Sequence, residues 1–111
     1  MAKYEKIFHG DFKEVLRIAD NTIMKSMSAS LEDSSEARFG DIHVSIRVYE
    51  RYSMMGGNRV SLNLTVVSEE DRVFVSAITS GGSQAMFFKL NTFGEESFLD
   101  PLADALERYA R

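Results

Sequence analysis

Residues 41–80 read DIHVSIRVYERYSMMGGNRVSLNLTVVSEEDRVFVSAITS, and their alternation of apolar and polar side chains decides the fold class. Even positions are apolar in the runs 42–48 and 60–66, and odd positions are apolar in the run 73–77. Successive side chains on a strand point to opposite faces, so these runs predict antiparallel strands with one buried and one wetter face. The stretch predicts a sheet and two candidate surfaces, but no chemistry.

The parity of the apolar positions predicts how neighbouring strands pair, because opposed residues face the same way. The first two runs are both even, so we expect an odd number of residues, or a bulge, in the connection around 53–58. A two-residue turn at Glu69 and Glu70 would place Val66 opposite Val73. A further turn through 81–84 predicts a last strand at 85–90.

The flanking segments predict two helices and two more strands. Residues 4–8 resemble a first strand, and a helix follows with Asp11 as its N-cap and Glu14 three positions later. Its apolar stripe consists of Phe12, Val15, Leu16, Ala19 and Ile23. Residues 26–31 predict a second strand, and the polar residues 32–36 predict a turn or irregular edge.

The last 21 residues, 91–111, are helical in character. Because proline fits poorly inside a helix, we expect a short turn at 94–99 and then a helix from Pro101, capped by Asp100. Its stripe consists of Phe98, Leu99, Leu102, Leu106 and Tyr109. The sequence thus predicts a single α+β domain over residues 1–111. We expect an antiparallel sheet of about five to six strands backed by an N-terminal and a C-terminal helix, in the order β-α-β-β-β-β-β-α.

Composition narrows the classes of function. The net charge of -4 disfavours nucleic acid, whose phosphates are bound chiefly by Lys and Arg. There is no cysteine, which excludes disulfides, thiolate metal ligands and thiol nucleophiles and fits a cytoplasmic protein. No apolar run is long enough to span a membrane, so we expect a soluble chain with neither a membrane nor a nucleic-acid partner.

Four segments resemble a family of small bacterial proteins of unknown function: RVYERY at 47–52, GGNRVSL at 56–62, FVSAITSGGSQ at 74–84 and FFKLNTFGEESFL at 87–99. The resemblance covers nearly the whole chain and implies a bacterial origin, but it implies no activity, ligand or catalytic residue. In element order alone the chain also resembles the helix-grip proteins. In these proteins a curved antiparallel sheet wraps a long C-terminal helix and encloses an apolar ligand. Likeness of fold does not license function.

Sequence motifs for catalysis are weak. His9 and His43 are the two histidines, and no carboxylate stands at a metal-binding spacing from them. We therefore predict no metal, no cofactor and no catalytic residues. The glycine pair at 56–57 is better explained as a turn than as a phosphate cradle, because no Walker-type lysine follows it. An enzyme is the third hypothesis, behind two kinds of binding.

The leading hypothesis is an interaction surface on the polar face of the sheet. We predict that this face carries Arg47, Tyr49, Arg51, Asn63, Thr65, Val67, Phe74 and Ile78. The last three would leave an exposed apolar patch, which a second copy of the chain could cover. The alternative is a module that binds a small apolar ligand between sheet and helices, lined by methionines and by Phe12, Phe39, Phe87, Phe88, Phe93 and Phe98. An ordinary solvated face and an ordinary filled core explain the same residues.

Overall fold

The computed structural model describes residues 1–26, 28–52, 59–81 and 88–110. The fold is α+β, as predicted, with five antiparallel strands and two helices in the order β-α-β-β-β-β-α. The elements are β1 (Ala2–His9), α1 (Phe12–Met24), β2 (Ser30–Phe39), β3 (Ile42–Tyr52), β4 (Arg59–Glu69), β5 (Arg72–Gly81) and α2 (Phe88–Tyr109).

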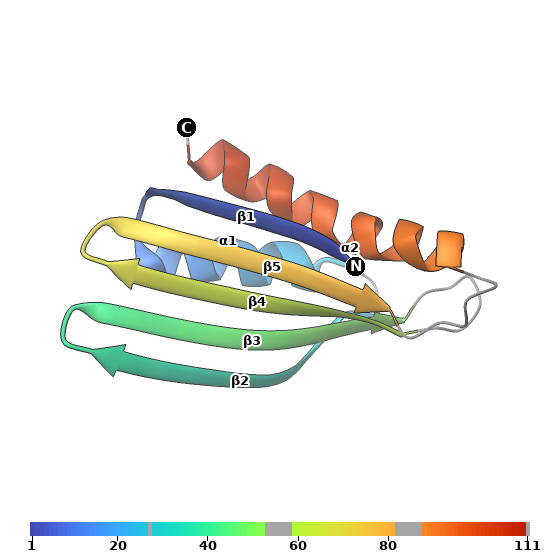
Figure 1. The fold of residues 1–111 in the computed structure, drawn as a ribbon, viewed down its shortest axis with the longest axis horizontal. Helices are drawn as coiled ribbons and strands as arrows, with labels where there is room; N and C mark the ends of the chain where they lie inside the picture. The colour runs from blue at the N-terminus through green and yellow to red at the C-terminus, as the bar shows by residue number, and fades with distance from the viewer. Residues whose placement is uncertain (27, 53–58, 82–87, 111) are drawn as a thin grey trace.

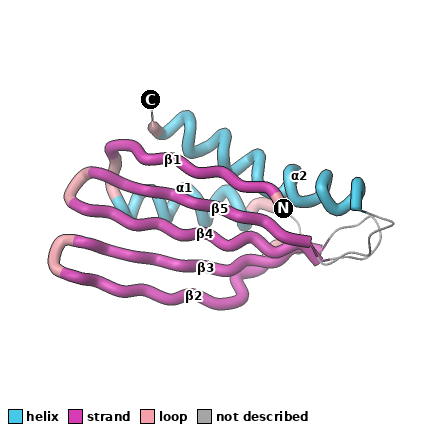
Figure 2. The backbone as a smooth tube through the Cα atoms, in the orientation of Figure 1, coloured by secondary structure: helices cyan, strands magenta, loops and turns pink. Residues whose placement is uncertain are grey.

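The sheet has the strand order β1-β5-β4-β3-β2, so β1 and β2 form its two edges. Figure 1 shows both helices on the far side of the sheet, and the tube in Figure 2 follows the same two-layer arrangement. Helix α2 packs on β5, β1 and β4, and α1 packs on β4 and on α2. In the described part of the chain, the near side of the sheet carries no helix. We call this side the open face and the covered side the helix face.

The core lies between the helix face and the two helices. Strand β4 contributes Val60, Leu62, Leu64 and Val66, and β5 contributes Val73, Val75 and Ala77. The helices add Val15, Leu16, Ala19, Ile23, Phe98, Leu99, Leu102 and Leu106, which are members of the two predicted stripes. Burial of these side chains is the main source of stability.

Helix α1 begins as the sequence predicts. The carboxylate of Asp11 accepts a 3.0 Å hydrogen bond from the backbone N–H of Glu14, which satisfies one of the donors left open at a helix start. Helix α2 is held to the edge strand by Glu107. This carboxylate accepts a 2.6 Å hydrogen bond from the Tyr4 hydroxyl and forms a 2.9 Å ion pair with Lys6.

The predicted strand at 85–90 is wrong where the structure describes it. Residues 88–90 form the first turn of α2, and residues 85–87 lie outside the described part. Strand β5 pairs with β1 on one side and β4 on the other, so no neighbour position beside β5 is left for a following strand. Helix α2 also runs through Pro101 without the predicted break. Phe98 and Leu102, on either side of the exposed proline, are buried in the core, and this packing offsets the helical hydrogen bond that proline removes.

Two predicted turns are displaced. Residues 32–36 belong to β2, where a bulge between Leu31 and Asp33 adapts the pairing with β3. Between β4 and β5 the turn falls at Glu70 and Asp71, so that Val66 is paired with Val75. This register differs by two residues from the predicted one. A shift of two preserves which side chains are buried, because the side-chain period of a strand is two.

Candidate functional site

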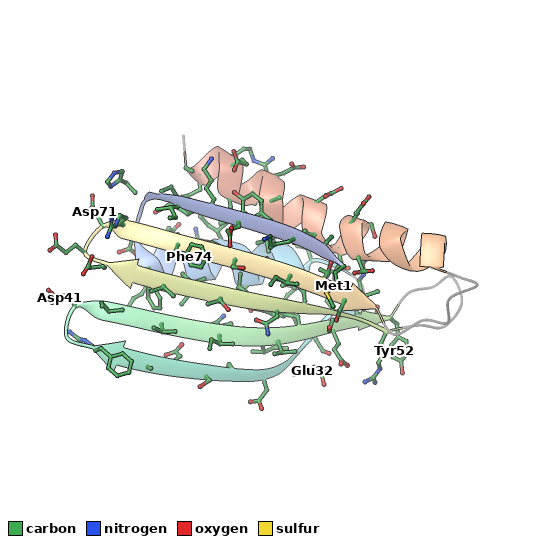
Figure 3. The ribbon with its side chains drawn as sticks, in the orientation of Figure 1. Met1, Glu32, Asp41, Tyr52, Asp71 and Phe74 are labelled. Carbon is green, nitrogen blue, oxygen red and sulfur yellow. The ribbon has the colours of Figure 1, made fainter. Side chains whose placement is uncertain are left out.

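A continuous apolar band crosses the open face over all five strands. In the register of the sheet, Ile7 lies beside Phe74, Phe74 beside Val67, Val67 beside Val44, and Val44 beside Ala37. Ile7 exposes 66% of its surface. Figure 3 shows Phe74 on the near side of the sheet, with the helices behind it. We call these five residues the apolar band.

More apolar side chains flank the apolar band. Ile42 and Phe39 are paired at one end of the face, and Phe39 is 70% exposed. Toward the other end the open face carries Ile46, Val48 and Ile78. A shallow hollow of about 350 Å³ lies on the band, lined by Ile7, Ile42, Val67, Glu69, Arg72 and Phe74. An apolar area that reaches both edges of a sheet is uncommon on a monomer surface and is typical of an interaction site.

Charged groups stand at the margins of this apolar area. Arg72 forms a 3.1 Å ion pair with Glu69, and Arg59 forms a 2.8 Å ion pair with Glu50. Lys3 lies on β1 and Asp33 on β2, at opposite edges of the open face. The apolar band thus lies toward one end of the open face, and the next row across the sheet is largely polar, with Ser76, Thr65 and Ser35.

The predicted interaction surface divides between the two faces of the sheet. Asn63, Thr65, Val67, Phe74 and Ile78 lie together on the open face, as expected. The other three residues are on the helix face, because Arg47 is paired with Leu64, Tyr49 with Leu62 and Arg51 with Val60, and these partners are buried. The prediction that all eight share one face is wrong.

The cause of this error is the connection between β3 and β4. Tyr52 is paired with Arg59, so six residues separate the strands, where the sequence reading expected an odd number or a bulge. With an even number, even positions of β3 face odd positions of β4. Ile42, Val44, Ile46 and Val48 consequently lie on the open face, whereas the sequence reading placed them in the core.

Polar residues of β3 are accommodated on the helix face by specific partners. The Tyr49 side chain is fully buried, and its hydroxyl donates a 2.8 Å hydrogen bond to Oδ1 of Asp20 in α1. Burial raises the pKa of Tyr49 to about 12; Arg47 opposes this shift and Asp20 adds to it. Arg47 lies 3.6 Å from the same carboxylate. This arrangement fixes the sheet to α1.

Arg51 lies at the end of β3 beneath α2. Its guanidinium stands 4.5 Å from the ring centre of Phe98, a cation–π geometry. Nη1 donates to Oγ of Ser26 over 3.1 Å, and Nη2 donates to Oγ of Ser97 over 2.7 Å. Burial lowers the pKa of Arg51, but an arginine keeps its charge at neutral pH.

Sequence reasoning missed most of the apolar area. Ile7, Ala37, Phe39, Ile42, Val44, Ile46 and Val48 belong to the open face and were not predicted there. One signal was available in the run 42–48. Its even positions are apolar, and its odd positions carry His43, Ser45 and Arg47. The alternation indicates that the two faces differ, but it does not show which of them faces the helices.

The phenylalanines predicted to line a ligand cavity lie in different parts of the structure. Phe98 is buried in the core, Phe12 is partly buried against it, and Phe39 is on the open face. Side chains 87, 88 and 93 lie outside the described residues. Residues 27, 54, 55 and 86, four of the methionines, are outside as well.

The two histidines lie in different environments. The ring of His43 lies 5.3 Å from that of Phe12, on the helix face. His9 is exposed and 3.2 Å from Asp71. Among the described residues no group of three or more potential ligand side chains could hold a metal ion. Within the same residues, neither helix combines the length and apolarity needed to cross a bilayer.

Comparison with known proteins gives a family. The model of a family of unknown function, DUF6054, matches residues 1–110. The chain belongs to this family. No curated protein matches the sequence. Membership in DUF6054 confirms the predicted resemblance to a family without an assigned activity, and the match includes every strand that contributes to the open face.

Proposed function

We propose that this chain is a non-catalytic, self-associating domain that forms a homodimer through the open face. The observation that carries the proposal is the apolar band, which crosses all five strands and has no covering element in the described structure. Leaving such an area in water is unfavourable by about 25 cal/mol for each Å² that could be buried. A second copy presents the same area and is always available to the chain.

The size of the open face supports a second copy of the chain as the partner. Five strands spaced by about 4.8 Å, with about nine residues each at about 3.3 Å, give a face of about 24 by 30 Å. Two such faces in contact would bury roughly 1,400 Å² in total, within the range of about 1,200–2,000 Å² typical of stable protein pairs. Sheets pack face to face in this way in β-sandwiches, with their strands within about 30° of each other.

A two-fold axis along β4, parallel to the strands, is the symmetry that the residues favour. Such an axis places β1 of one copy over β2 of the other, and β5 over β3, because these strands are equally distant from β4. Ile7 would then meet Ala37, and Phe74 would meet Val44. Within the apolar band, a larger side chain of one copy then opposes a smaller one of the other, as a packed interface requires.

The charges favour the same axis. It sets Lys3 of each copy opposite Asp33 of the other, since both residues lie in the row of Asn63 at opposite edges. An axis perpendicular to the strands through Thr65 would instead set Lys3 over Ile7 of the other copy. Covering a lysine with an isoleucine removes water from a charge without giving it a partner.

The proposal is tested by the mass of the particle in solution, measured by native mass spectrometry and by size exclusion with light scattering. We expect wild type to be a dimer and Phe74→Glu to be a monomer, because two carboxylates would be buried close to the axis. Met24→Glu is the matched control: it places the same charge on an exposed apolar residue of α1, on the other side of the molecule.

The outcomes separate clearly. A wild type that is monomeric at about 100 µM, or a Phe74→Glu variant that stays dimeric, overturns the proposal. Circular dichroism of Phe74→Glu shows that loss of the dimer is not loss of the fold. A reproducible bound mass in the native spectrum would instead indicate a ligand module.

We further propose that residues 1–111 act as one α+β domain in a bacterial cytoplasm. Among the described residues, the core cluster that joins both helices to the sheet supports the first statement, and the lack of cysteine supports the second. The net charge of -4 argues against nucleic acid as the partner. Immunoblotting of cell fractions tests the location, and recovery in a periplasmic or membrane fraction would contradict it.

A further inference from the structure

A second concave site lies in the helix layer, away from the open face. It is a pocket of about 510 Å³ between the C-terminal end of α1, the end of β3 and the middle of α2. Figure 3 marks this end of the sheet by Tyr52, opposite the turns at Asp41 and Asp71. Its size is within the range of about 300–1,000 Å³ typical of small-molecule sites.

The pocket combines an apolar wall with a cationic rim. Ile23, Phe98 and Leu102 form the apolar part, and all three belong to the core. Lys25, Arg51 and Arg108 bring three positive charges, against the one negative charge of Asp104. The lining therefore carries a net charge of +2 (3 − 1), in a chain whose overall charge is -4. An excess of positive charge in a concavity attracts anions.

Arg51 is the best-positioned of the three cations. The hydroxyls of Ser26 and Ser97 and the ring of Phe98 hold its guanidinium in one orientation. A guanidinium that is already ordered loses less entropy when it binds a planar anion. The ring of Phe98 offers a flat apolar surface beside that charge.

We propose that this pocket binds a small organic carboxylate with an apolar body. The carboxylate would lie against Arg51, with Lys25 and Arg108 adding positive charge at the rim, and the body against Phe98, Ile23 and Leu102. This chemistry differs from the wholly apolar ligand that composition suggested. It is independent of the dimer, because none of these residues belongs to the open face.

The test is an NMR titration of the full-length chain with three probes that share one tail: octanoate, octyl phosphate and octanol. We expect octanoate to bind at about millimolar concentration or tighter, and octanol about tenfold more weakly, because it lacks the charge. Amide shifts are expected near Ser26, Arg51 and Ser97. The titration is done in the Phe74→Glu background too, so that adsorption of the tail to the open face is recognised.

Rim variants give the second readout. Lys25→Gln and Arg108→Gln remove charge without touching the core, and each is expected to weaken octanoate binding about three- to tenfold. The matched control is Arg17→Gln, the same change on an exposed residue of α1 that pairs with Glu14 outside the pocket. It is expected to leave the affinity unchanged.

Several results would overturn the proposal. These are equal affinities for octanoate and octanol, shifts confined to the open face, unchanged affinity in both rim variants, or no binding up to about 10 mM. Tighter binding of octyl phosphate would reject the carboxylate and assign a phosphate ligand. A monomeric wild type that binds octanoate in the pocket would overturn the dimer alone.

Discussion

Tyr49 in β3 and Asp20 in α1 are joined by a 2.8 Å hydrogen bond, in which the phenol donates to the carboxylate. Tyr49 is fully buried, so the bond is shielded from water. We expect Tyr49→Phe to lower the free energy of unfolding by about 1–2 kcal/mol, since the ring is kept and a charge-assisted bond is lost. Urea unfolding measures the difference. Tyr52→Phe, on a half-exposed tyrosine, is the control and should change little.

The same phenol predicts how stability depends on alkaline pH. The pKa of Tyr49 is raised from 10.0 to about 12, because burial disfavours the phenolate. The unfolded chain therefore loses this proton before the folded one. The stabilising effect is complete below pH 10 and is lost as the pH rises from about 10 to 12. Between pH 10 and 12, the free energy of unfolding should fall less steeply with pH in Tyr49→Phe than in wild type. Equal slopes would contradict the prediction.

Gly10 permits a close approach between the β1–α1 turn and the end of α2. A Cβ at this position would lie 2.9 Å from Cε2 of Tyr109. We expect Gly10→Ala to lower the free energy of unfolding by about 1–3 kcal/mol, because the ring must move. Tyr109→Ala should remove most of that cost in the double variant. Gly40→Ala is the control, because its cost comes from a backbone φ of +57° and open space surrounds it, so Tyr109→Ala should not rescue it.

Lys3 and Asp33 test the orientation of the proposed dimer. In the described part of the chain neither residue forms an ion pair. The two-fold axis along β4 would bring Lys3 of each copy close to Asp33 of the other. We expect Lys3→Glu and Asp33→Lys each to raise the dimer dissociation constant several-fold, by about 1 kcal/mol, and the double variant to recover most of the loss. Analytical ultracentrifugation gives the constants. Additive losses in the double variant would exclude this axis but not the dimer.

Ser45 is a buried polar residue whose removal should be harmless. Its Oγ has no hydrogen-bond partner among the described residues, and the side chain is fully buried on the helix face opposite Val66. A buried hydroxyl without a partner is unfavourable by about 1–3 kcal/mol. We therefore expect Ser45→Ala to keep or raise the midpoint of thermal unfolding. A fall of several degrees would show that the hydroxyl has a partner that the structure does not describe.

Local signals in the sequence predicted the elements whose determinants are local. The cap at Asp11 and the stripe of α1 are examples, because a helix start and a buried helix face depend on residues within a few turns. Strand alternation in β4 and β5 also predicted the buried face correctly. The two-residue shift at Glu70 did not matter for burial, since it preserves parity.

What the sequence could not show depends on contacts between distant segments. The partner of β5 is β1, about 70 residues earlier, and this pairing removes the position in which a strand at 85–90 would have stood. Which side chains of β3 face the helices depends on the number of residues between Tyr52 and Arg59. Alternation alone is equally consistent with either orientation. Ile42, Val44, Ile46 and Val48 were assigned to the core for this reason.

The edge strand β2 has features that disfavour the addition of further chains to the sheet. All ten of its residues are exposed, and a strand edge in water is a template on which further chains can add without end, as in amyloid. Here the bulge at Leu31 and Asp33 breaks the regular edge, and Glu32, Asp33 and Glu36 repel a second copy of the same strand. In the proposed dimer, contact through the open face would close after two molecules, whereas contact through β2 would propagate into a fibre. The bulge and the acidic side chains thus disfavour the addition of further strands to β2.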